Sequence, residues 1–576
     1  MCGISGHLAR RGTARSDLVR TMTEALKHRG PDGMNFYDTA EVSLGFNRLA
    51  IIDPGGSWQP FINHDSTIVL IVNGEIYNYR ELRKDLLSKG HVFRSKGDCE
   101  VILHLYEEHG TLFLDRLRGM FALALWDERM GRLLLARDRL GEKPLYLRES
   151  PDGLLFASEA KALIAAGVDV ELEPRSVNAY FHLEYVTEPD SILRGVQKIP
   201  AGHLITVNTK DWAIHDRPYW LLDAAEARAD RPDHVIADLL RELSPLVAHA
   251  DQPIGVALSG GIDSSIVAAL AARDADIRPK AFSVGYTGHR GIDERELARS
   301  FANELDMEFH EIELGPASVV RLFPQVVAAW DDPIADMAGI CYFAVMRSAR
   351  EAGVRVMLQG QGADELFWGY PWVREAMRRA DRGSAPIFYE LDPDFREARD
   401  DGPRYYGEAM RGLTPPLFPP TPPDQLIMST YLRENGIAQG DRLSMANSVE
   451  LRLPFVDHHL VDAVIGLRKA APDHHEPPKH RLREAVRFLL PTAIIDRPKR
   501  SFSPPIKQWY EILFASYGEL LLEGELVRRG IISPAAAREL TKAHFPPGGG
   551  SPFAFKALAL EMWCRHNLLR RGARPC

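Results

Sequence analysis

The sequence predicts two joined units: an N-terminal α+β domain of antiparallel sheets and a C-terminal α/β domain with a parallel sheet. Three observations lead to this fold class. In the first part of the chain, strand-like runs outnumber helical patterns, which favours antiparallel layers. From about residue 253, strands alternate with helices of roughly ten or more residues, which is typical of a parallel sheet. After a proline-dense segment at 413–425, the pattern is mostly helical.

In the N-terminal part, aliphatic and β-branched runs predict strands, and apolar residues three or four apart predict helices. The expected strands are Gly3–Leu8, Val42–Asp53, Ile68–Asn73, Met120–Trp126 and Arg132–Ala136. The expected helices are Ser16–Lys27, Tyr79–Lys89 and Cys99–His109. Turn signals that bound several strands are Pro54-Gly55-Gly56, Asn73-Gly74 and Asp152-Gly153.

The C-terminal part begins after a polar stretch rich in Asp, Arg and Ala, where we place the domain boundary. The expected units are an N-terminal domain at 2–207, a linker at 208–233 and a second domain at 234–576. Expected strands are Ile254–Leu258, Lys280–Tyr286, Glu308–Ile312 and Val354–Leu358. Expected helices between them are Ser264–Arg273 and Asp293–Leu305.

Composition excludes several classes of protein. The 576 residues are 45% hydrophobic and 26% charged, as in a soluble globular chain. With 70 basic and 79 acidic residues the net charge is −9, which argues against nucleic-acid binding by bulk electrostatics. Five scattered cysteines without a CxxC pair argue against a disulfide framework or structural zinc. No apolar run approaches the ~20 residues of a membrane span, and no secretory leader is visible. We therefore expect a cytoplasmic protein with no membrane or nucleic-acid partner.

The first candidate catalytic residue is Cys2. If Met1 is removed, the Cys2 thiol lies beside its own α-amine, which can accept the thiol proton and create a thiolate nucleophile. Taken alone, a cysteine at position two is more often chance. Other groups in the same domain suit a site that cleaves the side-chain amide of glutamine. Arg48 could bind the α-carboxylate, and Glu75 and Asp98 the α-ammonium.

The same domain also offers hydrogen-bond donors for an oxyanion. The Asn73 side chain and the Gly74 N–H could donate hydrogen bonds to a developing oxyanion. Read singly, Asn-Gly is a hairpin turn and the charges are a solvated surface. Together, CGI, HRGPD, RLAIID, NGEIYN and GDCE resemble the class II glutamine amidotransferase domain, an N-terminal-nucleophile hydrolase, which implies an αββα sandwich of antiparallel sheets. The resemblance implies Cys2 as nucleophile, Arg48 and Asp98 as glutamine ligands, and Asn73 with Gly74 as oxyanion hole.

The second group is SGGIDSS at 259–265, which follows a strand and opens a helix. Its glycines allow close approach of a pyrophosphate, its N–H groups face an anion, and Asp263 suits a Mg²⁺ ion. QGQGADELF at 359–367 follows another strand and places Asp364 at the same edge of the sheet. SGGxDS in this context resembles the loop of ATP pyrophosphatases, which adenylate an oxygen and release pyrophosphate.

The two domains together resemble glutamine-hydrolysing asparagine synthetases of the B type, over essentially the whole chain. The resemblance implies a glutaminase site, an ATP-dependent site that activates a carboxylate as acyl-AMP, and an ammonia tunnel between them. It implies ATP and Mg²⁺ as cofactors, and glutamine and a small carboxylic acid as substrates. A homodimer is also expected. The implied ATP ligands are Leu258, Ser259, Gly260, Gly261, Asp263, Ser264, Val284, Gln359 and Gly360. Asp263 and Asp364 are the implied metal ligands, Gln361 and Asp364 the acceptor ligands, and Lys499 the catalytic cation.

One departure from the family pattern concerns the acceptor. Where the family usually has SGEGADE, this chain has QGQGADE, and a neutral Gln361 cannot act as a general base. Trp368, Tyr370 and Trp372 add aromatic bulk just beyond. Aspartate is therefore the default acceptor, and a uronic acid or a specialised-metabolite carboxylate is the alternative. A non-catalytic homologue that binds glutamine or nucleotide is a second alternative.

Overall fold

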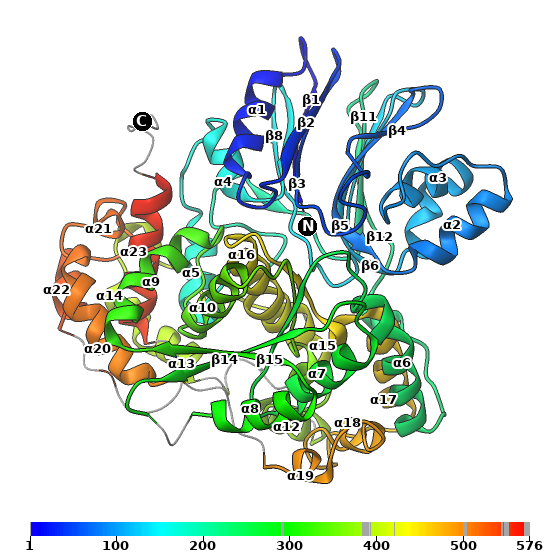
Figure 1. The fold of residues 1–576 in the computed structure, drawn as a ribbon. Coiled ribbons are helices and arrows are strands. Elements are labelled where there is room, and N and C mark those ends of the chain that lie inside the picture. Colours follow the sequence, from blue (N-terminus) through cyan, green and yellow to red (C-terminus); the bar gives the residue numbers. More distant parts are fainter. Residues whose placement is uncertain are drawn as a thin grey trace.

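A computed structural model describes residues 2–289, 293–382, 391, 393–419, 421–498, 504–542, 545 and 552–568. Its N-terminal part contains two six-stranded antiparallel sheets, and its larger C-terminal part is built on a five-stranded parallel sheet. Figure 1 shows the first part above the second, with the N-terminus at the junction between them. Cys2, the first residue that the structure describes, is buried there.

The first sheet has the strand order β10-β8-β9-β1-β3-β2. Its strands are β1 Gly3–Ala9, β2 Gly33–Asp38, β3 Val42–Arg48, β8 Tyr146–Ser150, β9 Gly153–Ala157 and β10 Gln197–Lys198. The second sheet has the order β12-β11-β7-β6-β5-β4. Its strands are β4 Phe61–Ile62, β5 Ile68–Ile76, β6 Gly119–Asp127, β7 Arg132–Arg137, β11 His203–Asn208 and β12 Ile214–Pro218. Buried aliphatic residues of both sheets, such as Ile4 and Ile71, form the core between them.

Helices cover the two outer faces of this pair of sheets. Helices α1 Ser16–Ala25 and α4 Ala160–Ala165 pack on the first sheet, and α2 Tyr79–Ser88 and α3 Glu100–His109 lie on the side of the second (Figure 1). The layers are therefore helix, sheet, sheet, helix, which confirms the predicted αββα sandwich. The 3-10 helix η1 Gly110–Arg116 and α5 Pro174–Leu183 complete the helical elements of this part.

Two expectations about strand ends were wrong. Asn73-Gly74 is not a turn, because β5 continues to Ile76 and pairs Asn73 with Ala122 and Gly74 with Phe121. A Cβ atom on Gly74 would lie 2.3 Å from the main-chain oxygen of Met120, so glycine is needed there for close packing in the sheet. The strand expected over Val42–Asp53 ends at Arg48, and the chain then turns into a loop in which Asp53 has a φ of 50°.

The third sheet has the order β15-β14-β13-β16-β17, and every neighbouring pair is parallel. Its strands are β13 Ile254–Ala257, β14 Lys280–Tyr286, β15 Glu308–Leu314, β16 Val356–Leu358 and β17 Glu450–Arg452. The nearby helices are α6 Pro232–Val247, α7 Ile262–Asp274, α8 Arg295–Glu304, α9 Pro316–Ala329 and α10 Ala338–Glu351. The carboxyl ends of β13 and β16 lie side by side, so the two glycine-rich loops that follow them meet at one edge of the sheet.

The rest of the chain is mostly helical, as expected. Its longer helices are α12 Pro371–Asp381, a π-helix (η6) at Met428–Ala438, α17 His458–Ala470, α20 Ile506–Tyr517 and α23 Phe553–Leu568. Its shorter helices include α11 Ala363–Leu366, α13 Pro393–Asp400, α14 Gly402–Tyr405, α15 Pro423–Ile427, α16 Gln439–Met445, α18 His480–Ala485, α19 Thr492–Ile495, α21 Glu525–Arg528 and α22 Pro534–Leu540. Within the described ranges, no helix combines the length and the apolar character needed to cross a membrane.

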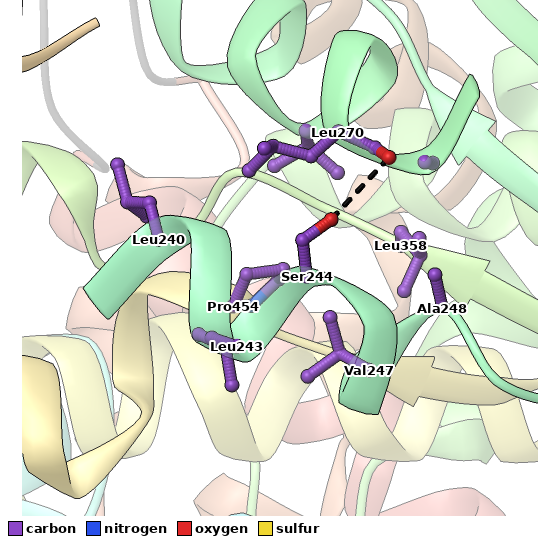
Figure 2. Close-up of a pocket in the computed structure, with 10 residues that line it drawn as sticks. Leu240, Leu243, Ser244, Val247, Ala248, Leu270, Leu358 and Pro454 are labelled. Atoms are coloured by element: carbon purple, nitrogen blue, oxygen red, sulfur yellow. Dashed lines mark hydrogen bonds between the residues drawn. The ribbon is translucent and has the colours of Figure 1, made fainter. Parts of the chain in front are cut away.

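Two further features of the fold are an edge strand in the polar stretch and a small cavity. The polar stretch 208–233 is not all linker, since β12 within it adds an edge strand to the second sheet. A small apolar cavity of about 10 Å³ lies under α6, lined by residues such as Leu243, Leu270 and Leu358 (Figure 2). The Ser244 hydroxyl donates to the Leu270 carbonyl at 3.3 Å, so this space is a packing gap with its polar atom already bonded.

Candidate active site

The structure buries Cys2 at the start of β1. Its main-chain N donates to Asn73 Oδ1 at 3.0 Å, so Asn73 holds the nitrogen that becomes the α-amine once Met1 is removed. Burial raises the pKa of the Cys2 thiol, although the Arg48 guanidinium opposes this. A thiol held protonated in this way needs a local base before it can attack, and the adjacent amine is the nearest candidate.

Asn73 also presents a donor for an oxyanion. Its side chain is fully buried, and Nδ2 has no hydrogen-bond partner among the described residues. A buried donor without a hydrogen bond lowers the stability of the folded protein, so we expect an oxygen of a ligand to accept a hydrogen bond from Nδ2. Because Asn73 Oδ1 is fixed by Cys2, the amide has one orientation, with Nδ2 turned to its other side. This geometry fits the predicted oxyanion hole, in which the Gly74 N–H is the second donor.

The predicted glutamine ligands lie around this group. Arg48 donates from Nη2 to the carbonyls of Asp53 at 2.8 Å and Gly56 at 2.5 Å, and lies over the Trp58 ring. Asp98 is buried and accepts hydrogen bonds from the Ile76 N–H at 2.8 Å and from Cys99 Sγ at 3.1 Å. Burial raises the pKa of Asp98, so a cationic ligand would be needed to favour its charged form.

Glu75 has a different partner from the one we expected. It is buried and lies 3.3 Å from Arg452 Nη2, which comes from β17 in the other part of the chain. Arg452 also donates from Nε to Glu450 at 2.7 Å, and its carbonyl accepts from the Gln359 N–H at 3.2 Å. A direct chain of contacts therefore joins the NGEIYN segment to the QGQGADE loop. The role of Glu75 toward glutamine stays a prediction.

A second buried ionic contact joins the two parts of the molecule. Arg29, from the HRGPD motif, donates to the Cys2 carbonyl at 3.1 Å, to Glu159 at 2.6 Å and to Asp441 at 2.9 Å. Asp441 belongs to α16 and also lies 3.5 Å from Lys143 Nζ. Nearby, Arg118 pairs with Asp457 at 2.8 Å. Charges removed from water need such partners, so these pairs fix the position of the Cys2 pocket on the parallel-sheet part.

A cavity of about 630 Å³ lies at the carboxyl edge of the parallel sheet. Most of the residues predicted to bind nucleotide and acceptor line it: Leu258, Ser259, Asp263, Ser264, Val284, Gln359, Gly360, Gln361 and Asp364. Gly260 and Gly261 lie in the same loop, where the Gly260 N–H donates to Glu294 at 3.2 Å and the Gly261 N–H to Ser259 Oγ at 3.1 Å. The predicted loops therefore meet around one space large enough for a nucleotide and a small acid.

Among the described residues, Lys479 is a cation at the edge of this cavity that our sequence reasoning missed. Lys479 Nζ lies 2.5 Å from Asp263 and 2.6 Å from Asp364. Burial lowers the pKa of Lys479, but the two carboxylates outweigh burial and raise it above its ordinary value. The expected Lys499 lies outside the described residues. Lys479 stands in no motif that we used, and only the Pro477-Pro478 pair before it marks the start of a helix.

The backbone around Lys479 is specialised for this position. Lys479 has a φ of 58°, in the left-handed region that lysine rarely adopts. Its N–H donates to the Phe367 carbonyl at 2.9 Å, which anchors it to the segment that carries Asp364. Such a conformation costs about 1–3 kcal/mol and is found preferentially at functional sites. This conformation therefore accompanies the placement of Lys479 against the two carboxylates.

The comparisons with known proteins agree with this arrangement. Residues 1–220 match the glutamine amidotransferase domain family, and residues 236–565 match the asparagine synthase family. The chain is similar to glutamine-hydrolyzing asparagine synthetase 1 of Bacillus subtilis, with 30% identity over 562 residues that cover 88% of each chain. It is also 30% identical over 560 residues to asparagine synthetase 2 of the same species, covering 87% of this chain and 72% of that one.

A relative with a different name is similar over the same length. Amidase chry2 of Gibberella zeae is 28% identical over 611 residues, covering 88% of this chain and 90% of that protein. Relatives named as asparagine synthetases and a relative named as an amidase are thus both similar to this chain over its two parts.

Proposed function

The chain belongs to the asparagine synthase family, and from this premise we propose that it converts a carboxylic acid into its amide, with glutamine as nitrogen donor and ATP as energy source. The observation that carries the proposal is the placement of Lys479 between Asp263 and Asp364, at the edge of a cavity lined by the SGGIDSS loop. A cation and two acids beside a phosphate-binding loop suit the transfer of an adenylyl group.

At the first site, the Cys2 thiol loses its proton to the α-amine and attacks the side-chain carbonyl of glutamine. The oxyanion that forms is stabilised by the Asn73 Nδ2 donor, which lacks a partner among the described residues, and by the Gly74 N–H. Arg48 and Asp98 hold the α-carboxylate and α-ammonium. Ammonia leaves, and water then releases glutamate from the thioester, so the net reaction is glutamine plus water to glutamate plus ammonia.

At the second site, an oxygen of the acceptor carboxylate attacks the α-phosphorus of ATP, and pyrophosphate leaves. Lys479 stabilises the negative charge that develops on the phosphate oxygens. Ammonia then attacks the acyl carbon, and AMP leaves with the electron pair of the broken C–O bond. The amide, AMP and pyrophosphate are the products, and a proton is released.

We assign Mg²⁺ to Asp263 and Asp364. Their carboxylates converge on one cationic group, the Lys479 ammonium, and oxygen ligands are the kind that Mg²⁺ prefers. When bound, the ion would neutralise charge on the phosphates. The ligand roles of Leu258, Val284, Gln359 and Gly360 toward ATP, and of Gln361 toward the acceptor, belong to the same proposal.

Ammonia has to travel from Cys2 to the cavity. The contacts from Glu75 through Arg452 to Gln359 run between the two sites, which supports a route through the interior of the junction. Aspartate is the default acceptor, since two of the relatives are named as asparagine synthetases. The alternative acceptors are a uronic acid or a specialised-metabolite carboxylate, and the relative named as an amidase supports keeping them. A homodimer is proposed on the resemblance alone.

The test is Cys2→Ala, assayed with glutamine and, separately, with ammonium. We expect glutamine-supported amidation to disappear and ammonium-supported amidation to stay within about twofold, because the thiol acts only in the first half-reaction. Cys564→Ala is the matched control, since Cys564 is a buried cysteine of α23 outside both sites. Loss of ammonium-supported activity in Cys2→Ala, with normal thermal stability, would overturn the two-site division. Absence of pyrophosphate release with any acid would favour the non-catalytic alternative.

A further inference from the structure

The part of the large cavity beyond the QGQGADE loop has a charge pattern that restricts the acceptor. We call this part the acceptor chamber and define it by Asp336, Tyr342, Glu365, Tyr370, Tyr431 and Asn435, all of which line the cavity. They come from the start of α10, from α11 and the loop after it, and from the π-helix. The inference below rests on the proposed function, because it concerns the acid that enters this chamber.

Two of these residues face the same space because they lie on one side of the π-helix. Tyr431 and Asn435 are four residues apart, Gly436 is five residues from Tyr431, and all three line the cavity. A π-helix is rare and is frequently found at functional sites, which agrees with a role in forming the chamber.

The chamber contains two carboxylates, those of Glu365 and Asp336. Within the described part of the chain, none of the residues that line the cavity is Arg, Lys or His. Lys479, at the edge of the cavity, is already held by Asp263 and Asp364. Neutral donors make hydrogen bonds to the chamber acids. Tyr370 donates to Glu365 at 3.1 Å, and Asp336 accepts from the Ala338 N–H at 2.9 Å and from Gln439 Nε2 at 3.3 Å. The chamber therefore favours positive charge in a ligand.

Aromatic rings add to this preference. Tyr370 and Tyr431 meet edge to face, with centroids 5.8 Å apart and an interplanar angle of 78°. The ring centroid of Trp372 lies 6.3 Å from that of Tyr431 and 6.1 Å from that of Tyr370. The electron-rich faces of Tyr and Trp attract ammonium groups, and the attraction is stronger where water is excluded. Carboxylates together with such rings are the composition of a site for an organic cation.

We propose that the acceptor carries a protonated amine and has no carboxylate other than the one that is amidated. The reacting carboxylate lies toward Lys479, and the amine lies in the acceptor chamber against Glu365, Asp336 and the tyrosines. Free aspartate meets only part of this requirement. Its ammonium suits the chamber, but its second carboxylate would be buried among acids without a cation, which is costly. The substrate class is thus an amino acid or amino acid derivative with a single free carboxylate.

The experiment uses three acids that differ by one charged group each: isoasparagine (the α-amide of aspartate), aspartate and succinamic acid. Isoasparagine has an ammonium and one carboxylate, aspartate has a second carboxylate, and succinamic acid lacks the ammonium. Binding is measured by isothermal titration to the full-length enzyme saturated with Mg²⁺ and a non-hydrolysable ATP analogue. We expect isoasparagine to bind about tenfold more tightly than either of the others. Equal binding of all three, tighter binding of aspartate, or no binding by any of them would overturn the proposal.

Two variants test whether the chamber acids are responsible. Glu365→Gln and Asp336→Asn keep the shape of the side chain and remove its charge, and each should reduce the preference for isoasparagine over succinamic acid by about tenfold. Affinity for the ATP analogue should not change, whereas a merely structural role would weaken both ligands. Glu296→Gln, at an exposed position on α8, is the matched control. An unchanged preference in both variants would overturn the assignment of the amine to this chamber.

Pyrophosphate release is measured in the same samples with ammonium present. Selective binding of isoasparagine without pyrophosphate release from any acid would contradict the proposed function and leave the charge preference standing. Release with equal efficiency from all three acids would contradict the charge preference and leave the proposed function standing.

Discussion

The Cys2 pocket and the ATP cavity differ in how they hold charge. Around Cys2, the charged side chains are buried and paired with one another. Arg29 pairs with Glu159 and Asp441, and Arg452 pairs with Glu75. The cavity is instead an open space of about 630 Å³, with the Lys479 ammonium held between two acids at one side. The first pocket is built to recognise one small amino acid, and the second has room for ligands that complete its charge balance.

The sharpest test of this comparison is Lys479→Gln. Because Lys479 is the cation that we assign to the charge developing on ATP, we expect ammonium-supported amidation to fall by about 10²–10³-fold. Glutamine hydrolysis should stay within about threefold. Pyrophosphate release and glutamate formation are measured in parallel, with Lys84→Gln on the exposed surface as the matched control. A fall in both activities of similar size would show that the two pockets are not separable.

Asn73→Ala tests the other pocket. It removes the buried Nδ2 donor and the acceptor that holds the Cys2 nitrogen, so glutamine hydrolysis should fall by about 100-fold. Ammonium-supported amidation should be unchanged, which is the opposite pattern to that of Lys479→Gln. Asn63→Ala is the control, because Asn63 is a buried asparagine that bonds outside the pocket, to Glu107. Hydrolysis within twofold of the unmodified protein would exclude Asn73 from the oxyanion hole.

Arg452→Met tests the contact between the pockets. The substitution leaves Glu450 and Glu75 buried without this guanidinium, so we expect a loss of about 3–5 kcal/mol in the free energy of unfolding. Arg452→Lys retains the charge, and its smaller loss separates the effect of charge from that of geometry. In Arg452→Lys, the ratio of glutamate formed to amide formed should rise, because a single ammonium cannot keep both guanidinium contacts, to Glu450 and to Glu75. Denaturant unfolding and the product ratio are the measurements. An unchanged ratio would show that the contact is only structural.

The smallest effect is expected for Val284→Ala in the cavity. Val284 lines the space assigned to ATP, and shortening it removes apolar contact worth up to ~0.8 kcal/mol per methylene. The KM for ATP should rise about fivefold, with the KM for glutamine unchanged. Val235→Ala in α6 provides a control of the same chemistry away from the cavity. A rise in the KM for glutamine of the same size would indicate a general loss of structure.

The two pockets also differ in how much of them could be predicted from the sequence. Each motif that contributes to the Cys2 pocket is a short continuous segment of the sequence. Cys2, Arg48, Asn73 and Asp98 could therefore be found from the sequence, and the structure brings them together. The strands were predicted because their buried sides are continuous aliphatic runs. Asn73-Gly74 was taken for a turn because local turn chemistry says nothing about the neighbouring strand, whose backbone requires a glycine there.

The cavity shows the limit of this reasoning. Its loops follow β13 and β16 and were found because glycines and acids at strand ends have a recognisable pattern. Lys479 comes from the start of α18, far along the chain from both loops, and a single lysine has no local signature. The same holds for Tyr431 and Asn435, since no periodicity in the sequence shows that the helix that carries them borders the cavity. Long-range contacts of this kind need the fold.

The interior position of Cys2 has a practical consequence for anyone who prepares this protein. Its main-chain nitrogen is bonded to the buried Asn73 amide at the junction of the two parts, where Figure 1 places the start of the chain. An affinity tag fused ahead of Cys2 would leave a peptide bond in place of the basic amine and would have to occupy packed space. Preparations intended for glutamine assays should therefore carry their tag at the opposite terminus, or have the leading residues cleaved back to the cysteine.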